Sequence, residues 1–183
     1  VNNKKYLKTV STLPNKSRRG LPLFYKDIDK YNVKIWYQSP VGRGIDYVLP
    51  KKIELNESFF TGLGLSLGDG LNNPSIRNTH YTFANVNFKL VQVIYKWLID
   101  YFKFDSKKIQ IFLNIPIENK NYSTKYVDNA KKIFPRGKIK TYYLKRFKEA
   151  TLLLQLSSPI FQLIYLNIFN RLKHNILRNR LNR

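Results

Sequence analysis

The sequence contains no cysteine and no methionine, and its only histidines are His80 and His174. The absence of cysteine excludes disulfides, thiol nucleophiles and cysteine-based zinc sites, and two histidines are too few for a histidine-rich metal centre. Acidic residues are also scarce, at 11 among 183 residues. Any metal bound by this chain is therefore expected to have oxygen ligands.

The chain also lacks a secretory signal, because Lys4, Lys5 and Lys8 interrupt any apolar run at the N-terminus. The uncharged stretch 150–169 is broken up by polar residues and Pro159, which favours a strand followed by a Pro-initiated helix over a membrane segment. We expect an intracellular, soluble protein of the cytoplasm or nucleoid, or of an organelle, without a membrane partner. The start at Val1 and the lack of methionine predict a processed or trimmed product.

Basic residues dominate the charge. Lys and Arg number 33, which gives a net charge of +22 and a pI near 10.1. This excess indicates a polyanionic partner. Because 43% of the residues are hydrophobic and 15% aromatic, the charge belongs to a folded body. We expect a basic N-terminal arm and β-hairpin over residues 1–52 and one main domain over residues 53–183.

Hydrophobic periodicity predicts an α+β fold. The acid-free segment 1–20 is expected to be an extended basic arm, and two β-rich runs, 33–38 and 45–49, flank a turn-forming sequence and predict the hairpin. The segments that follow are predicted as helix 57–68, strand 81–87, helix 88–104, strand 109–115, helix 122–134, strands 138–146 and 151–157, and a final helix from Pro159. The final helix has an apolar stripe formed by Phe161, Ile164, Tyr165, Ile168, Leu172 and Ile176.

The most informative segment, 62–70, reads Gly-Leu-Gly-Leu-Ser-Leu-Gly-Asp-Gly. It places Asp69 at the C-terminal end of a helix for which Asn56 is a suitable N-cap. A carboxylate is unfavourable there because the helix C-terminus carries partial negative charge, and a bound cation is the simplest compensation. Phe59, Leu63 and Leu67 are expected to form the apolar stripe of this helix.

Gly64 and Gly68 lie one turn apart on another face of the same helix. They leave a bare strip of backbone against which a second helix can pack closely. Each glycine costs roughly 1 kcal/mol relative to alanine in a helix, so this composition indicates a packing role. A phosphate-binding loop is disfavoured because no Lys-Ser or Lys-Thr pair follows the last glycine.

This segment resembles the LAGLIDADG motif of homing endonucleases, in particular the single-motif, archaeal-like members. The matching positions are Gly64, Leu65, Gly68, Asp69 and Gly70, and the departures are Gly62, Leu63 and Leu67. More loosely, the resemblance extends from about residue 50 to residue 183. It implies an αββαββα fold whose antiparallel sheet forms a saddle over DNA, here enlarged by a strand and a helix between the halves and by the N-terminal hairpin.

The resemblance also implies a function. Two copies would pair through Gly64, Leu65 and Gly68, and Asp69 would be the catalytic acid that binds Mg²⁺ or another divalent cation, together with the Gly68 carbonyl. The implied protein is a homodimeric, site-specific DNA endonuclease that hydrolyses phosphodiester bonds, makes double-strand breaks in a partly palindromic duplex and serves intron or intein mobility.

Polar and basic residues after the motif are the candidates for DNA contact. Asn and Gln suit adenine edges, while Lys and Arg suit guanine or phosphate. The candidates are Asn72, Asn73, Arg77, Asn85, Gln110, Asn114, Lys138, Lys140, Tyr142, Lys145 and Arg146. For each sheet residue among them, an ordinary solvated surface remains the alternative.

Two other functional hypotheses stay open. Glu118-Asn119-Lys120 supplies the Asp/Glu-x-Lys element of a different nuclease class, although Pro116 is expected to interrupt the strand before it. A DNA- or RNA-binding protein of the same fold that does not cut, such as an intron-splicing maturase or a transcription regulator, would have the same charge and fold. The presence of Asp69 favours cleavage.

Overall fold

The computed structural model describes residues 5–9, 22–38, 45–69, 80–135, 137–158, 160–168 and 170. The chain forms two compact units, one of Val1–Leu55 with Ser158–Arg183 and the other of Asn56–Ser157. Both helices and strands are present, in the α+β class. The expected main domain, 53–183, differs from this division because the residues after Ser157 group with the first unit.

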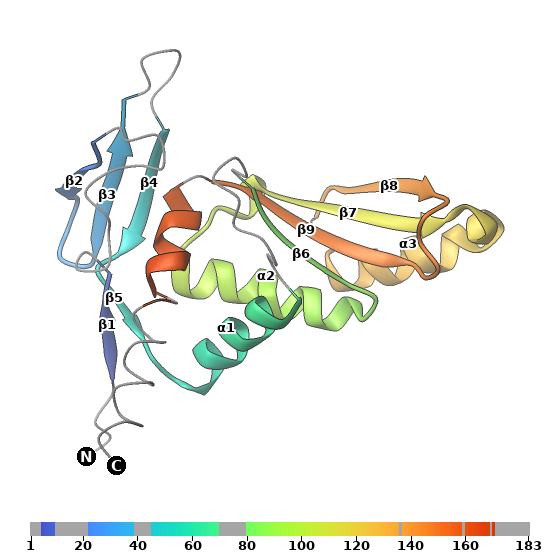
Figure 1. The fold of residues 1–183 in the computed structure, drawn as a ribbon, viewed down its shortest axis with the longest axis horizontal. Helices are drawn as coiled ribbons and strands as arrows, with labels where there is room; N and C mark the ends of the chain where they lie inside the picture. Colours follow the sequence, from blue (N-terminus) through green and yellow to red (C-terminus); the bar gives the residue numbers. More distant parts are fainter. Residues whose placement is uncertain are drawn as a thin grey trace. The chain divides into compact units, whose positions relative to one another are not determined.

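The first unit contains two small antiparallel sheets (Figure 1). β1 (Tyr6–Lys8) pairs with β5 (Lys52–Glu54), and the second sheet has the order β2 (Phe24–Asp27), β3 (Asn32–Tyr37) and β4 (Ile45–Pro50). The predicted hairpin is confirmed as β3 and β4, in which Tyr37 lies opposite Ile45. Its turn, residues 39–44, lies outside the described residues. The sequence did not predict β1, β2 or β5.

Part of the expected basic arm belongs to this unit. Residues 6–8 form β1, and the Thr9 amide donates a hydrogen bond of 2.9 Å to the Lys51 carbonyl. These residues of the expected arm therefore form an extended strand, because β5 offers their backbone groups a partner. The rest of the arm, residues 1–4 and 10–20, lies outside the described residues.

The last predicted helix is present over residues 160–168. The Ser158 hydroxyl accepts a hydrogen bond of 3.2 Å from the Phe161 amide, as an N-cap residue does. The members of the predicted stripe in this range are buried, namely Phe161, Ile164, Tyr165 and Ile168. Pro159, Leu172 and Ile176 lie outside the described residues.

The second unit contains three helices and a four-stranded sheet among its described residues. The helices are α1 (Glu57–Asp69), α2 (Phe88–Phe102) and α3 (Ser123–Ile133), with short 3₁₀ turns η2 (Ser106–Lys108) and η3 (Ile117–Tyr122). The strands are β6 (His80–Asn85), β7 (Ile109–Pro116), β8 (Ile139–Leu144) and β9 (Thr151–Ser157), in the sheet order β6-β9-β7-β8. Periodicity predicted the type of every one of these helices and strands.

The expectation of a fully antiparallel sheet is wrong. β9 pairs antiparallel with β6 and β7, whereas β7 and β8 run parallel. The parallel pair is connected through η3 and α3, because parallel neighbours need a crossover. Between α1 and α2 the described residues contain the single strand β6, and residues 70–79 lie outside them, so the αββαββα order stays a prediction.

The helices of this unit lie on one side of its sheet (Figure 1). α1 packs on β6, α2 on β6 and β9, and α3 on β7 and β8. Alternate strand residues face these helices and form the core: Tyr81, Phe83, Ile109, Ile111, Leu113, Ile115, Leu152, Leu154 and Leu156 are buried. The residues between them point to the other face, which contains the candidate DNA contacts.

The N-cap of α1 and most of its buried face agree with the prediction. Asn56 Oδ1 accepts a hydrogen bond of 2.9 Å from the Phe59 amide, which confirms the N-cap. Phe59 and Leu63 are buried, but Leu67 is 40% exposed, so its place in the stripe was wrong. Each step of four residues rotates a helix position by about 40°, and the second step carries Leu67 out of the interface. Ser66 is buried instead and makes a 2.6 Å hydrogen bond with the Tyr81 hydroxyl.

Gly62 departs from the LAGLIDADG motif, and its close approach to α2 explains why a glycine stands there. A Cβ atom on Gly62 would lie 2.2 Å from Trp97 Cδ1, which is far inside van der Waals contact. The indole is held in place because its Nε1 donates a hydrogen bond of 3.0 Å to the Phe59 carbonyl. Gly62 therefore lets α1 and α2 approach within this unit.

We expect Gly62→Ala to destabilise the protein by about 1–3 kcal/mol, the typical cost of overpacking a core, despite the higher helix propensity of alanine. Gly64→Ala is the matched control, because nothing lies within 4 Å of a Cβ atom at that position. Urea unfolding at low protein concentration measures both changes. A Gly62→Ala protein as stable as the wild type would contradict the packing account.

Candidate nucleic-acid interface

The sheet of the second unit brings polar and aromatic side chains together on the face away from its helices. The strand registers align them in three rows across neighbouring strands. The rows are Thr82, Gln155 and Gln110; then Ala84, Leu153, Phe112 and Lys140; then Thr151, Asn114 and Tyr142. Residues paired in register share one face of a sheet, and this set is called here the open face. Asn114 and Thr151 within it are buried.

An aromatic and basic cluster lies at the β7–β8 edge of the open face. Phe112 and Tyr142 have ring centroids 5.9 Å apart, and Lys140 Nζ lies 5.7 Å from the Phe112 centroid. Lys140 and Tyr142 are exposed, and Gln110 is exposed beside them on β7. The cluster therefore offers a cation, a phenol and an amide to a ligand at this face.

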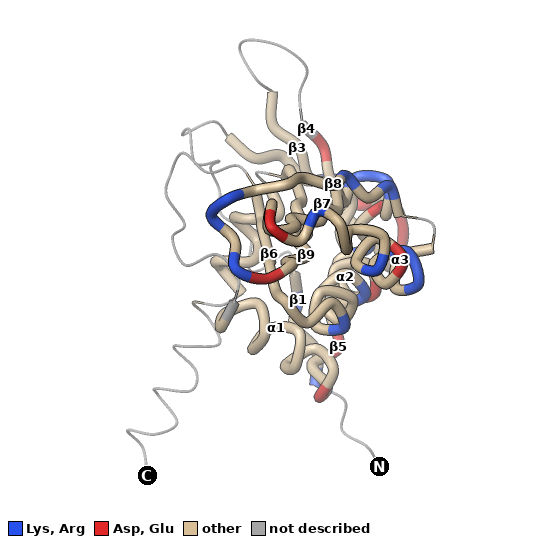
Figure 2. The backbone as a smooth tube through the Cα atoms, turned by 90° about the vertical axis from the view of Figure 1, so that its right-hand side faces the viewer, with Lys and Arg blue, Asp and Glu red and all other residues tan. Residues whose placement is uncertain are grey.

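Basic residues are concentrated in the segment 120–148, which includes α3 and β8. From Lys120 to Lys148 the only acid is Asp128, and Figure 2 shows the resulting basic segments around α3 and β8. Lys138, Lys145 and Arg146 are exposed, and none of them forms an ion pair with a residue that the structure describes. Unpaired surface cations of this kind suit phosphate groups.

The structure thus brings four of the predicted DNA contacts onto one face of β7 and β8: Gln110, Asn114, Lys140 and Tyr142. Lys138 precedes β8 and lines a hollow with Ile109 and Ile111. Asn114 is only 7% exposed, so it offers little surface to a ligand. Lys145 and Arg146 follow β8 in the turn toward β9.

Asn85 does not belong to the open face. It alternates with Ala84 and so falls on the helix side of β6, and its Oδ1 accepts a hydrogen bond of 2.7 Å from the Asn87 amide. Asn72, Asn73 and Arg77 lie outside the described residues. Gln155 was not placed on this face by the prediction, although its alternation with buried residues on β9 was a usable signal. Phe112 was placed on the same face as Gln110 and Asn114, but it was not named as a DNA contact.

One side of α1 is formed by small and apolar residues. Gly64 and Gly68 are exposed, and a Cβ atom on either would have nothing within 4 Å. Phe60 and Leu67, which flank the two glycines, are 46% and 40% exposed, and Leu65 is half-buried. This glycine strip, Gly64 with Gly68, therefore lies on an apolar helix surface without a packing partner among the described residues.

Asp69 is the last residue of α1, one residue beyond the predicted end of the helix. The last turn of α1 has no basic residue to offset the partial charge of the helix end. The side chain of Asp69 lies outside the described part of the chain. Within that part, no three His, Asp or Glu side chains gather closely enough to hold a metal ion.

The competing Asp/Glu-x-Lys element does not lie at a strand end. Glu118, Asn119 and Lys120 belong to η3, and β7 ends at Pro116, the residue expected to interrupt it. Lys120 Nζ lies 5.7 Å from the Tyr143 ring centroid. The element therefore lies in the connection between β7 and α3.

None of the helices in the described ranges has the length and apolar character needed to cross a bilayer. Comparison of the chain with protein-family models, curated proteins and solved structures found no match. Functional assignment therefore depends on the geometry of α1 and of the open face.

Proposed function

We propose that this protein is a LAGLIDADG-type DNA endonuclease that acts as a homodimer and uses a divalent cation. The observation that carries the proposal is the glycine strip on α1, the helix that ends at Asp69. Each helical glycine costs about 1 kcal/mol, and Trp97 explains Gly62 but not Gly64 or Gly68. A second copy of α1 packed on the strip gives both glycines a role.

A twofold axis through paired α1 helices would have a direct chemical consequence. The interface would be isologous, so each glycine strip would contact the same strip of the partner. Because Asp69 ends the helix, pairing would bring the two carboxylates toward the axis. One chain with a single such helix would then supply one acid to each half of a composite site, as cleavage of two DNA strands requires.

Mg²⁺ or a similar hard cation fits the donor set that α1 offers. Asp69 and the Gly68 carbonyl are oxygen donors at a helix end where the last turn has no basic residue. These two groups would hold the ion in the active protein. When bound, the ion would supply positive charge that stabilises charge on the phosphodiester during hydrolysis, a reaction that is extremely slow without catalysis.

The open face would bind the duplex. Gln110 is suited to adenine edges, Lys140 to guanine or phosphate, and the basic residues after β8 to the DNA backbone. A homodimer would present two copies of this face, and each would read one half-site of a partly palindromic target. The non-cleaving alternative, a maturase or transcription regulator of the same fold, shares this binding mode and differs only in chemistry.

Cleavage of a bound duplex tests the function. Sites selected from a random duplex library in EDTA are cloned into a supercoiled plasmid and incubated with the protein. Linear plasmid is expected with Mg²⁺ and none with EDTA. A plasmid that is bound but never cut with any divalent cation would favour the non-cleaving alternative.

Duplex binding should weaken steeply with salt. Each neutralised phosphate contributes about −0.9 to the slope of log affinity against log salt, and a surface this basic contacts on the order of ten phosphates. We expect Lys140→Gln to make the slope less steep by about one phosphate equivalent. Lys96→Gln, an exposed change on α2 outside the basic segment 120–148, is the matched control and should leave the slope unchanged. Anisotropy titrations measure both slopes, and a nearly salt-independent affinity would refute the electrostatic account.

A further inference from the structure

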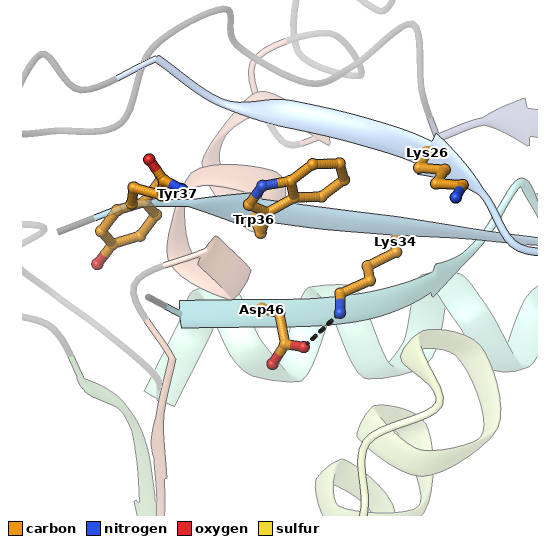
Figure 3. Close-up of a pocket in the computed structure, with 6 residues that line it drawn as sticks. Lys26, Lys34, Trp36, Tyr37 and Asp46 are labelled. Atoms are coloured by element: carbon orange, nitrogen blue, oxygen red, sulfur yellow. Dashed lines mark ion pairs between the residues drawn. The ribbon is translucent and has the colours of Figure 1, made fainter. Parts of the chain in front are cut away.

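A second aromatic and basic surface lies on the three-stranded sheet of the first unit. Alternate residues of β3 and β4, among them Val33, Ile35 and Leu49, are buried on one face. The register places the remaining side chains on the other face: Phe24 opposite Trp36, Lys26 opposite Lys34, and Trp36 opposite Asp46. Figure 3 shows four of these side chains, Lys26, Lys34, Trp36 and Asp46, coming from three neighbouring strands. We call this set the β2–β4 face.

Two aromatic rings form a platform on the β2–β4 face. The Phe24 and Trp36 ring centroids are 5.8 Å apart and their planes differ by only 26°, so the rings lie side by side in nearly the same orientation. Phe24 is 43% exposed and Trp36 is half-buried. An aromatic pair left accessible on an outer sheet face indicates a ligand with flat rings of its own.

A hollow adjoins the platform and supplies the charge. It has a volume of about 470 Å³ and is lined by Lys26, Lys34, Trp36, Tyr37, Gln38 and Asp46. Lys34 Nζ lies 2.9 Å from Asp46 Oδ2, while Lys26 makes no ion pair with any described residue. The hollow therefore combines two aromatic side chains with two ammonium groups, of which only that of Lys34 has an ion-pair partner among the described residues.

We propose that the β2–β4 face binds single-stranded nucleic acid. Unpaired bases would stack on Trp36 and Phe24, and the adjoining phosphates would lie near Lys26 and Lys34. Aromatic residues on an exposed sheet face beside basic groups are suited to this ligand, because unpaired bases offer free π-faces whereas bases in a duplex are already stacked. This site is separate from the duplex-binding open face, and the inference does not depend on the proposed endonuclease function.

The charge of the site favours a polyanion over other flat ligands. A neutral sugar would use the rings without the two lysines, and an acidic peptide would use the lysines without the rings. A nucleic-acid strand uses both, and the chain has a net charge of +22. Asp46 opposes a phosphate in the same place, so its removal is expected to tighten binding.

The test uses the full chain with short fluorescein-labelled oligo(dT) and oligo(U), whose relative affinities distinguish DNA from RNA as the natural ligand. Trp36→Leu and Phe24→Leu are each expected to weaken binding about tenfold, because stacking on one base is worth about 1–3 kcal/mol. Lys26→Gln should make the salt slope less steep by about 0.7. Asp46→Asn should raise the affinity severalfold.

Trp36 also provides a direct signal. The chain has two tryptophans, and Trp97 is only 3% exposed, so quenching by a stacked base reports on Trp36. Trp36→Phe keeps a ring at the platform and should retain most of the affinity while losing the quenching. This conservative variant separates a loss of stacking from a loss of folding.

Tyr31→Leu is the matched control, because this ring is 70% exposed but lies in the turn between β2 and β3. It should bind oligonucleotides like the wild type. The proposal is overturned if Trp36→Leu and Phe24→Leu bind like the wild type, or if Tyr31→Leu loses as much affinity as they do. Duplex binding and cleavage should be unchanged in both platform variants, so failure of this site and failure of the endonuclease proposal are distinguishable.

Discussion

Asp69→Asn is expected to abolish cleavage, by at least about a thousandfold, while duplex affinity stays within a few fold of the wild type. Asp69 is the only acid between Ser58 and Ile99, and it ends a helix whose last turn has no basic residue. An amide there would keep the shape of the side chain but remove the charge that holds the cation, and hydrolysis of phosphodiesters without metal assistance is extremely slow.

Cleavage of a cloned target and anisotropy binding to the same sequence, measured in parallel, check this prediction. Asp100→Asn is the matched control, because Asp100 is an exposed acid on α2 and has no role in the proposed site. It should cut like the wild type. Cleavage retained by Asp69→Asn would remove the metal assignment, whatever the control shows.

Gly64→Val is expected to destroy cleavage with Asp69 intact. A Cβ atom at Gly64 meets nothing within 4 Å among the described residues, so the valine should not disturb the monomer, and it raises the intrinsic helix propensity by several tenths of a kcal/mol. Against a second α1, however, the added side chain would push the two helices apart and separate the two acids. Gly68→Val should act in the same way.

Two measurements, the stability of the monomer and the formation of the two-chain complex on DNA, distinguish a lost interface from a folding defect. Thermal unfolding of the monomer should be unchanged or slightly improved, while sedimentation should show loss of the two-chain complex on DNA. Ser58→Val adds the same side chain at an exposed position near the start of α1, outside the glycine strip, and should cut normally. A Gly64→Val protein that still makes double-strand breaks would show that α1 is not the dimer interface.

Local patterns predicted most helices and strands because those signals are short-range. The predicted helix 88–104 and strand 109–115 each depend on burial of one face, and in the structure Val91, Ile94 and Leu98 of α2 and alternate residues of β7 are buried. The pairing of the strands could not be predicted from these local patterns. The parallel β7–β8 pair depends on the path of the chain through α3, which no local pattern of the two strands records.

The short strands of the first unit were missed for a related reason. β2 has four residues, all exposed, so it lacks the buried alternation that marks a half-buried strand. The stack of Phe24 on Trp36 then follows only from the β2–β3 register. Composition alone therefore gave no indication of the β2–β4 face.

The candidate site could be predicted in part. The sequence placed Asp69 at the end of α1 and separated the glycine strip from the buried side, because helix geometry fixes both. The sequence could not show that Gly62 is packed while Gly64 is exposed, because the Trp97 indole that packs on Gly62 comes from another helix. Asn85 was misplaced because strand alternation and the local bend at Asn87 direct it to the helix side.

The stoichiometry of the working complex tests the central claim most directly. The protein is bound to its selected duplex in EDTA, the complex is sized by sedimentation, and Mg²⁺ is then added to the same sample. Pairing through α1 predicts two chains per duplex and, after Mg²⁺ addition, cuts in both strands at positions related by twofold symmetry. One chain per duplex that still makes double-strand breaks would contradict the account, as would a two-chain complex that leaves the DNA intact.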